Sequence, residues 1–330
     1  MINQGKVLDT ALKHSKAGRF DIAERLLRSL PDDCLPARYN LGWYDLMHGD
    51  FQKGFDGLNL GRFIEVFGSK PIPGRIWRNE PLHGKTVLLR MEGGLGDEII
   101  NFRFARDFRA RGANVVICCS ASLAQVFSSH GYVCITEPAI PYTLYDFWVP
   151  AMSAAYVLGY DYSTLPGSLY INRPAAETST RMRIGIRWGG NNANKDVEPQ
   201  RKVQAQQMID LARSIDADFF SFQRDEDLVD VPFTDLRDRL ADWNETRAWL
   251  SSMDLLITSC TSVAHMAAAM GIQTWVLVPI LPYYTWAIPG ETSPWHNTVR
   301  LFRQTTAGSW KQPLERIRTE LSHLNHQRAA

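Results

Sequence analysis

The sequence lacks several features that would place it in a common class of protein. It has no run of eighteen apolar residues that could cross a membrane, and residues 1–20 are polar where a secretory signal would be apolar. Lys and Arg number 36 against 35 Asp and Glu, without a basic cluster that could neutralise a row of phosphates. We therefore expect a cytoplasmic protein with no transmembrane segment and no nucleic-acid partner.

Metal-binding patterns are also scarce. The five cysteines form no Cys-x-x-Cys pair and have no histidine at ligand spacing, which predicts buried thiols rather than a metal site. No pair of carboxylates stands at the end of an expected strand. We expect neither a metal nor another cofactor.

Two short segments near the N-terminus resemble each other. Residues 17–24 and 48–55 each place a Gly-x-Phe turn between amphipathic stretches, at a spacing close to the tetratricopeptide period of about 34 residues. This predicts a tetratricopeptide-like helical segment over residues 1–70, serving as a structural cap or as a surface for an acceptor, a protein partner or oligomerisation. The Pro- and Gly-rich residues 71–84 indicate a linker.

Short apolar runs alternate with helical patterns in the rest of the chain. This alternation predicts α/β domains with parallel sheets, an N-terminal one over residues 85–180 and a C-terminal one over residues 181–330 with a closing C-terminal helix. Two Rossmann-like domains of this kind, facing a cleft, form the GT-B arrangement. Ligands of such sheets bind beyond the carboxyl ends of the strands.

The first motif, residues 92–100, is a glycine-rich turn between a strand and a helix. Gly94, Leu95 and Gly96 allow close approach of a ligand to the backbone. The third glycine of the dinucleotide-binding fingerprint is missing, which disfavours a nicotinamide enzyme. Asp97 is a candidate general base for an acceptor hydroxyl, or it merely caps its own helix.

The second motif, residues 184–191, ends a strand with Trp-Gly-Gly-Asn. Trp188 and Asn191 would line a nucleotide or sugar pocket, and Arg201, with Lys195, could neutralise a diphosphate leaving group in place of a metal. A solvated loop is the alternative for these cations. Gln223 follows another strand and either reaches the same pocket or caps the strand end.

The third motif, residues 255–271, joins an apolar strand to a helix through small hydroxyl residues. Thr261 and Ser262 could hold a phosphate at the helix N-terminus, beside Cys260. His265 lies one turn into the helix. His265 could contact the donor, but a buried core histidine with satisfied hydrogen bonds is the commoner case.

With the Ser-Pro-Trp at 293–295 and the Arg-Leu-Phe-Arg-Gln at 300–304, these motifs resemble tetratricopeptide-linked bacterial glycosyltransferases related to the ADP-heptose:lipopolysaccharide heptosyltransferases. The motifs stand in that family's order over residues 70–315. The resemblance implies a nucleotide-sugar donor held mainly by the C-terminal half and an acceptor held mainly by the N-terminal half.

Three positions depart from the family's pattern. Cys260 stands where the family usually has an Asp expected to contact the donor sugar, Gly93 enters the glycine-rich turn, and residues 282–286 lose an acid and a base. These departures fit a changed donor, a changed acceptor or lost activity.

The sequence thus predicts a metal-independent, inverting glycosyltransferase that moves a sugar from a nucleotide-diphosphate sugar to a hydroxyl of a glycan, lipid or protein. Two alternatives stay open. One is a catalytically silent scaffold whose helical segment recruits a partner, and the other is an epimerase-type enzyme that binds the same donor and needs no acceptor.

Overall fold

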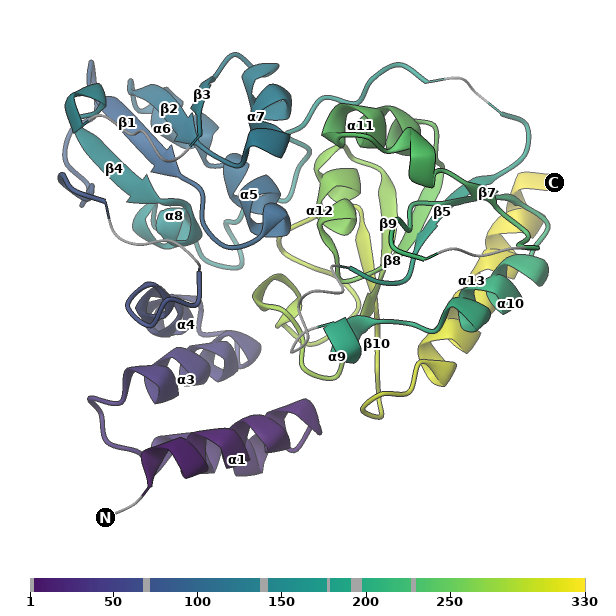
Figure 1. Ribbon diagram of the computed structural model, residues 1–330, viewed down its shortest axis with the longest axis horizontal. Coiled ribbons are helices and arrows are strands. Elements are labelled where there is room, and N and C mark those ends of the chain that lie inside the picture. Colours follow the sequence, from purple (N-terminus) through teal and green to yellow (C-terminus); the bar gives the residue numbers. More distant parts are fainter. Residues whose placement is uncertain are drawn as a thin grey trace. The chain divides into compact units, whose positions relative to one another are not determined.

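The computed structural model describes residues 3–67, 72–136, 142–176, 179–190, 198–226 and 230–329 (Figure 1). The chain divides into two compact units. The first contains residues 1–11 and 24–171, and the second contains residues 12–23 and 172–330. Within the described part of the chain, no helix is long and apolar enough to cross a membrane.

The N-terminal segment is helical, as the sequence predicts. Gly18 and Gly49, with φ of 73° and 90°, make the turns inside the two helix pairs, because glycine adopts positive φ without steric cost. The elements are α1 (Gln4–Lys16), α2 (Phe20–Arg28), α3 (Leu35–Met47), α4 (Phe51–Leu58) and the 3-10 helix η1 (Asn59–Arg62). Whether these helices are tetratricopeptide repeats stays a prediction.

Helices α3 and α4 touch backbone to backbone. A Cβ added at Gly42 would lie 2.6 Å from the carbonyl oxygen of Gly54, and one added at Gly57 would lie 2.6 Å from the Cα of Gly42. The aromatic rings of Phe51 and Phe55 on α4 are buried. Small residues at the crossing therefore let this short helix pair pack closely.

The first unit contains a four-stranded parallel sheet in the order β3-β2-β1-β4. Its core includes Leu88, Val116 and Trp148. The strands are β1 (Thr86–Arg90), β2 (Asn114–Cys118), β3 (Val133–Ile135) and β4 (Phe147–Pro150). The helices are α5 (Leu95–Phe102), α6 (Ala105–Ala110), α7 (Ala121–Ser128) and α8 (Ala154–Val157), with the 3-10 turns η2 (Tyr142–Leu144) and η3 (Ala151–Ser153).

The second unit contains a six-stranded sheet in the order β10-β9-β8-β5-β6-β7, in which every pair is parallel. Counted from β5, this is the Rossmann order 3-2-1-4-5-6, and the strand order reverses between β5 and β8. The strands are β5 (Arg183–Arg187), β6 (Asp218–Ser221), β7 (Thr234–Asp235), β8 (Leu255–Ser259), β9 (Gln273–Val278) and β10 (Val299–Arg303).

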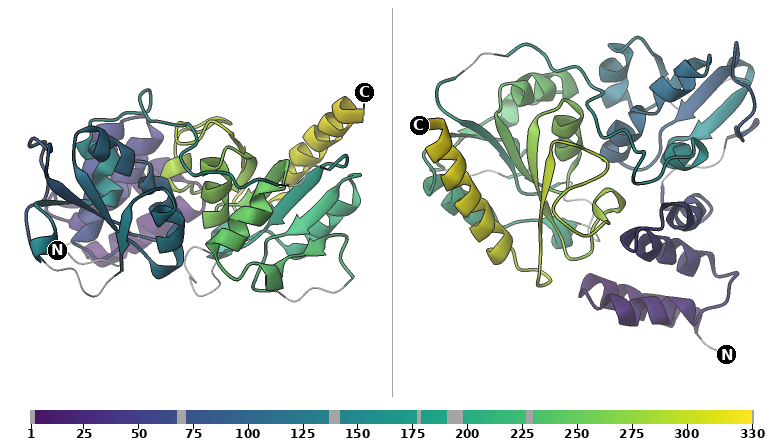
Figure 2. Two further views of the ribbon diagram at one scale, coloured as in Figure 1. Left: turned by 90° about the horizontal axis from the view of Figure 1, so that it is seen from above. Right: turned by 180° about the vertical axis from the view of Figure 1, so that it is seen from behind.

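Helices cover both faces of this sheet (Figures 1 and 2). Apolar side chains of α10 and α13 pack with the strands in one core, and those of α12 pack on the other face. The helices are α9 (Glu198–Arg201), α10 (Ala205–Arg213), α11 (Trp243–Ser251), α12 (Ser262–Ala269) and α13 (Lys311–Ala329), with η4 (Arg237–Arg239) and η5 (Tyr284–Trp286). The predicted α/β class with parallel sheets is confirmed.

The Gly42→Ala substitution should destabilise the helical segment. Alanine is favoured over glycine in a helix by about 1 kcal/mol, but the added methyl group would meet backbone atoms that cannot yield, and such overpacking costs about 1–3 kcal/mol. Gly5→Ala on α1 is the control, because its Cβ makes an ordinary 3.5 Å contact. Thermal unfolding followed by circular dichroism should show a lower Tm for Gly42→Ala only; an equal rise for both would refute the close crossing.

Candidate functional site

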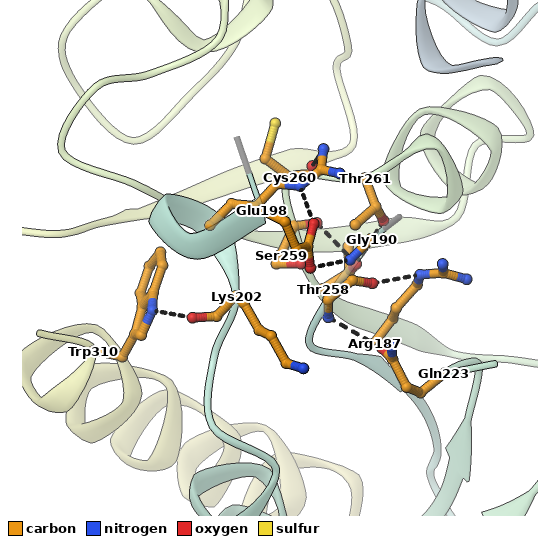
Figure 3. Close-up of polar contacts among 12 residues, drawn as sticks. Arg187, Gly190, Glu198, Lys202, Gln223, Thr258, Ser259, Cys260, Thr261 and Trp310 are labelled. Atoms are coloured by element: carbon orange, nitrogen blue, oxygen red, sulfur yellow. Dashed lines mark hydrogen bonds and ion pairs between the residues drawn. The ribbon is translucent and has the colours of Figure 1, made fainter. Parts of the chain in front are cut away.

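A cluster of polar groups lies at the point in the second unit where the strand order reverses (Figure 3). The loops after β5 and β6 are joined there, because Gly189 N–H donates to Gln223 Oε1 at 3.1 Å. Gly190 N–H donates to Glu198 Oε1 at 2.6 Å, which joins the β5 loop to α9. Gly190 and Glu198 are buried.

Arg201 connects this loop to the one after β8. Its Nε donates to Glu198 Oε2 at 2.8 Å, and its Nη1 donates to the carbonyl oxygen of Cys260 at 3.0 Å. A Cβ at Gly190 would lie 2.2 Å from Arg201 Nη2, so a larger residue there would displace the guanidinium. The structure therefore brings the predicted residues Arg201, Gln223 and Cys260 into one cluster.

Arg187, the last residue of β5, is a member of this cluster to which the sequence analysis gave no role. Its Nε donates to the Gly189 carbonyl oxygen and its Nη1 to that of Phe222, both at 2.9 Å. Burial, with the positive charges of Arg201 and Arg224, lowers the pKa of Arg187 to about 10 against the opposing effect of nearby carboxylates. The cluster thus concentrates guanidinium groups where an anion would be favoured.

The turn from β8 to α12 adds hydroxyl groups. Thr258 Oγ1 lies 3.2 Å from Thr261 Oγ1, and Thr261 is the N-cap of α12 but makes no side-chain capping bond. Among the described residues, the buried Ser259 Oγ has no hydrogen-bond partner, and neither has Gln223 Nε2. Unsatisfied buried polar atoms are uncommon, so these two call for an explanation such as a bound ligand or water.

Cys260 and His265 face an aromatic cluster instead. Trp286 Nε1 donates to Cys260 Sγ at 3.0 Å, and the imidazole ring of His265 stacks on Trp286 with ring centroids 4.9 Å apart. His265 Nδ1 lies 3.2 Å from His296 Nε2. His265 is buried and packed inside the second unit, and these contacts are of the kind that the core interpretation expects.

The remaining predicted residues of this unit divide into three cases. Ser262 begins α12. The ring of Trp188 lies in the hydrophobic core with 1% of its surface exposed, and its Nε1 donates to Glu226 rather than forming an open aromatic wall. Asn191 and Lys195 lie outside the described residues.

The glycine-rich loop of the first unit follows β1. Gly94 precedes the start of α5, and Leu95 and Gly96 form its first turn. Asp97 is buried, and its Oδ2 accepts a hydrogen bond from Gly94 N–H at 2.9 Å, so the carboxylate does cap its own helix. A role as a general base stays a prediction. Gly93 has a φ of 78° and lies against this carboxylate.

No group of three His, Cys, Asp or Glu side chains that could hold a metal ion occurs in the described part of the chain. Transfer without a metal stays a prediction, since that finding bears only on preformed clusters.

Comparison with solved structures identifies the fold. The glycosyl transferase family 9 protein from Veillonella parvula DSM 2008 is 12% identical with a TM-score of 0.53, over 75% of this chain and 100% of that chain. The E. coli ADP-heptose lps heptosyltransferase II is 15% identical with a TM-score of 0.52, over 74% of this chain and 100% of that chain. No model of a protein family and no curated protein matches the sequence. The fold is therefore a mixed α/β fold with parallel sheets, consistent with a GT-B-like glycosyltransferase fold.

The Gly93→Ala substitution should disturb the glycine-rich loop more than its backbone strain alone explains. A Cβ there would lie 2.6 Å from Asp97 Oδ2, whereas Gly84, with a similar φ of 70°, has open space around it. A positive φ costs alanine about 1–2 kcal/mol at either site, and the clash should add about 1–3 kcal/mol at Gly93 alone. Denaturant unfolding measures the difference between the two variants, and equal losses would contradict the contact with Asp97.

Proposed function

We propose that this protein is an inverting, metal-independent glycosyltransferase that uses a nucleotide-diphosphate sugar as donor. The proposal assigns residues 1–70 to a tetratricopeptide-like segment and 71–84 to a linker. Residues 85–180 then form the acceptor domain and 181–330 the donor domain of a GT-B enzyme. The observation that carries the proposal is the polar cluster at the carboxyl ends of β5 and β8, because ligands of Rossmann sheets bind at this point.

A diphosphate suits the chemistry of this cluster. Arg201 and Arg187 bring two guanidinium groups together, and each could form charge-assisted hydrogen bonds to phosphate oxygens. Helix α12 begins directly after Thr261, and the dipole at a helix N-terminus favours an anion. Ser259 Oγ and Gln223 Nε2 supply polar atoms that have no partner within the described residues.

The same groups would promote departure of the nucleoside diphosphate. In an inverting transfer, the acceptor oxygen bonds to the anomeric carbon as the bond to the leaving phosphate oxygen breaks on the opposite face. The acceptor proton passes to a carboxylate, for which Asp97 is the candidate, and the guanidinium groups stabilise the charge that develops on the diphosphate. The hydroxyl belongs to a glycan, lipid or protein acceptor.

A catalytically silent scaffold is the second candidate, and two contacts favour it. Asp97 uses one carboxylate oxygen to cap its own helix. Cys260, which stands in place of an expected acid, accepts a hydrogen bond from Trp286 instead of facing a sugar. A scaffold could bind a nucleotide but would release none from a donor.

Product analysis in EDTA separates the candidates. We expect the protein to release free nucleoside diphosphate from one class of ADP-, GDP-, UDP- or dTDP-sugar when acceptor is present, and Arg201→Met to reduce this release about a hundredfold. Arg300→Met is the control, because this guanidinium on β10 pairs with Glu291, which precedes the strand, and with Glu320 on α13. A changed sugar without acceptor would indicate an epimerase, and binding without any turnover would indicate the scaffold.

The Ser259→Ala substitution should separate stability from binding. Removing a buried hydroxyl that has no partner in the described residues should leave the Tm of the free protein unchanged or slightly raised. Loss of a hydrogen bond to a phosphate oxygen, about 1.5–3 kcal/mol, should weaken nucleoside diphosphate binding about tenfold or more. Calorimetric titration measures the affinity, and an unchanged Kd would remove Ser259 from the donor site.

A further inference from the structure

A buried ion pair joins the helical segment to the glycine-rich loop. Arg62, at the end of η1, donates from Nε to Glu92 Oε1 and from Nη2 to Glu92 Oε2, both at 2.7 Å. Glu92 is the residue that opens the glycine-rich motif. Arg62 is 8% exposed and Glu92 3%, so the pair is almost entirely shielded from water. Both residues lie within the first unit.

Hydrogen bonds extend this pair on either side. Arg62 Nη2 also donates to Ser153 Oγ at 3.1 Å, and Ser153 Oγ donates to Asn59 Oδ1 at 2.6 Å. Gly93 N–H, next in the loop, donates to the carbonyl oxygen of Phe67 at 3.1 Å. The chain that follows α4 therefore holds two successive residues of the loop, Glu92 through its side chain and Gly93 through its backbone.

A tyrosine of the helical segment lies within electrostatic range of Asp97. Burial raises the pKa of Tyr39 on α3 to about 12, with a smaller contribution from the negative charge of Asp97 and an opposing one from a hydrogen bond with Trp43. Tyr39 also packs edge-on against Phe67, with ring centroids 6.3 Å apart. The carboxylate of Asp97 is thus near enough to the helical segment for its charge to raise the pKa of Tyr39.

These contacts give the helical segment a role beyond that of a structural cap. A buried ion pair contributes little net stability, because desolvation of the two charges offsets their attraction, but its forked geometry fixes the groups it joins. The next residue of the loop, Gly94, donates its backbone N–H to Asp97 Oδ2 at 2.9 Å, so the backbone that Glu92 and Gly93 anchor is hydrogen-bonded to that carboxylate. Holding Glu92 and Gly93 therefore fixes the position of Asp97.

We propose that residues 59–67 of the helical segment are part of the sugar-transfer machinery, with Arg62 and Glu92 as positioning residues that hold the glycine-rich loop and thereby Asp97. The role of Asp97 in this statement rests on the proposed function. The coupling of the helical segment to the loop does not, and it can be measured without a substrate. The helical segment is then a component of the acceptor side and not a detachable cap.

Hydrogen–deuterium exchange on the full-length protein tests the coupling. In Arg62→Met we expect the amides of residues 92–98 to exchange about tenfold faster or more, because loss of the fork frees the loop to open locally. Arg103→Met is the matched control: Arg103 is 1% exposed, and its guanidinium donates to the carbonyl oxygens of Ile100, near the end of α5, and of Pro166. If both variants loosen residues 92–98 equally, or neither does, the positioning role is refuted.

A double variant distinguishes positioning from plain stability. Arg62→Met with Glu92→Met removes both buried charges, so its Tm should recover toward that of the wild type, while exchange of residues 92–98 should stay fast. Arg62→Lys keeps the charge without the fork and should give intermediate exchange. Recovery of both Tm and slow exchange in the double variant would mean that the pair is merely structural.

An assay of nucleotide release tests whether the coupling matters for the reaction. It uses the donor that the wild type accepts. We expect Arg62→Met to slow release about tenfold or more with acceptor present, while the Kd for the nucleoside diphosphate, bound by the second unit, stays unchanged. If the wild type releases no nucleotide from any donor, the proposed function is wrong. The hydrogen–deuterium exchange results would still show whether the helical segment is coupled to the loop. Normal release by Arg62→Met despite a loosened loop would overturn the link to the reaction.

Discussion

The parallel pairing of β5 with β8 is the constraint on which the candidate donor site depends. It sets Arg187 opposite Thr258 and so brings the loop of Gly189 and Gly190 beside the turn that begins α12. Neither loop makes a site alone: one supplies guanidinium groups and the other supplies hydroxyls and helix amides. Ligands of such sheets bind beyond the carboxyl ends of the strands, at the point where the strand order reverses. The sheet topology therefore determines where an anion can be held.

Much of this could be predicted from the sequence, because the signals are local. Apolar runs predict strands at the positions of β1, β5 and β8, and the glycine-rich and Thr-Ser turns mark loops that follow strands. The edge strands β7 and β10 were not predicted: β7 has two exposed residues, and β10 alternates with arginines and was interpreted only as a motif. Such strands are recognised by their pairing, which involves distant residues.

The site residues that sequence reasoning missed are also those defined by distant contacts. Arg187 was counted as part of a strand, although its place at the strand end directs it to the cluster. Glu198 holds both Gly190 and Arg201, yet no motif marks it. Arg62 and Glu92 are 30 residues apart and lie in two structural segments, so no local sequence pattern indicates that they pair. Trp188 illustrates the reverse error, since an aromatic residue beside glycines suggested a wall but packs in the core.

A crystal structure with a bound nucleoside diphosphate, obtained in EDTA, tests the central claim most directly. The account predicts phosphate oxygens within hydrogen-bond distance of the Arg201 guanidinium and of the first amides of α12, with Ser259 Oγ or Gln223 Nε2 gaining a partner. Phosphates seated elsewhere on the protein, or binding that occurs only when a metal ion is added in place of EDTA, would contradict it.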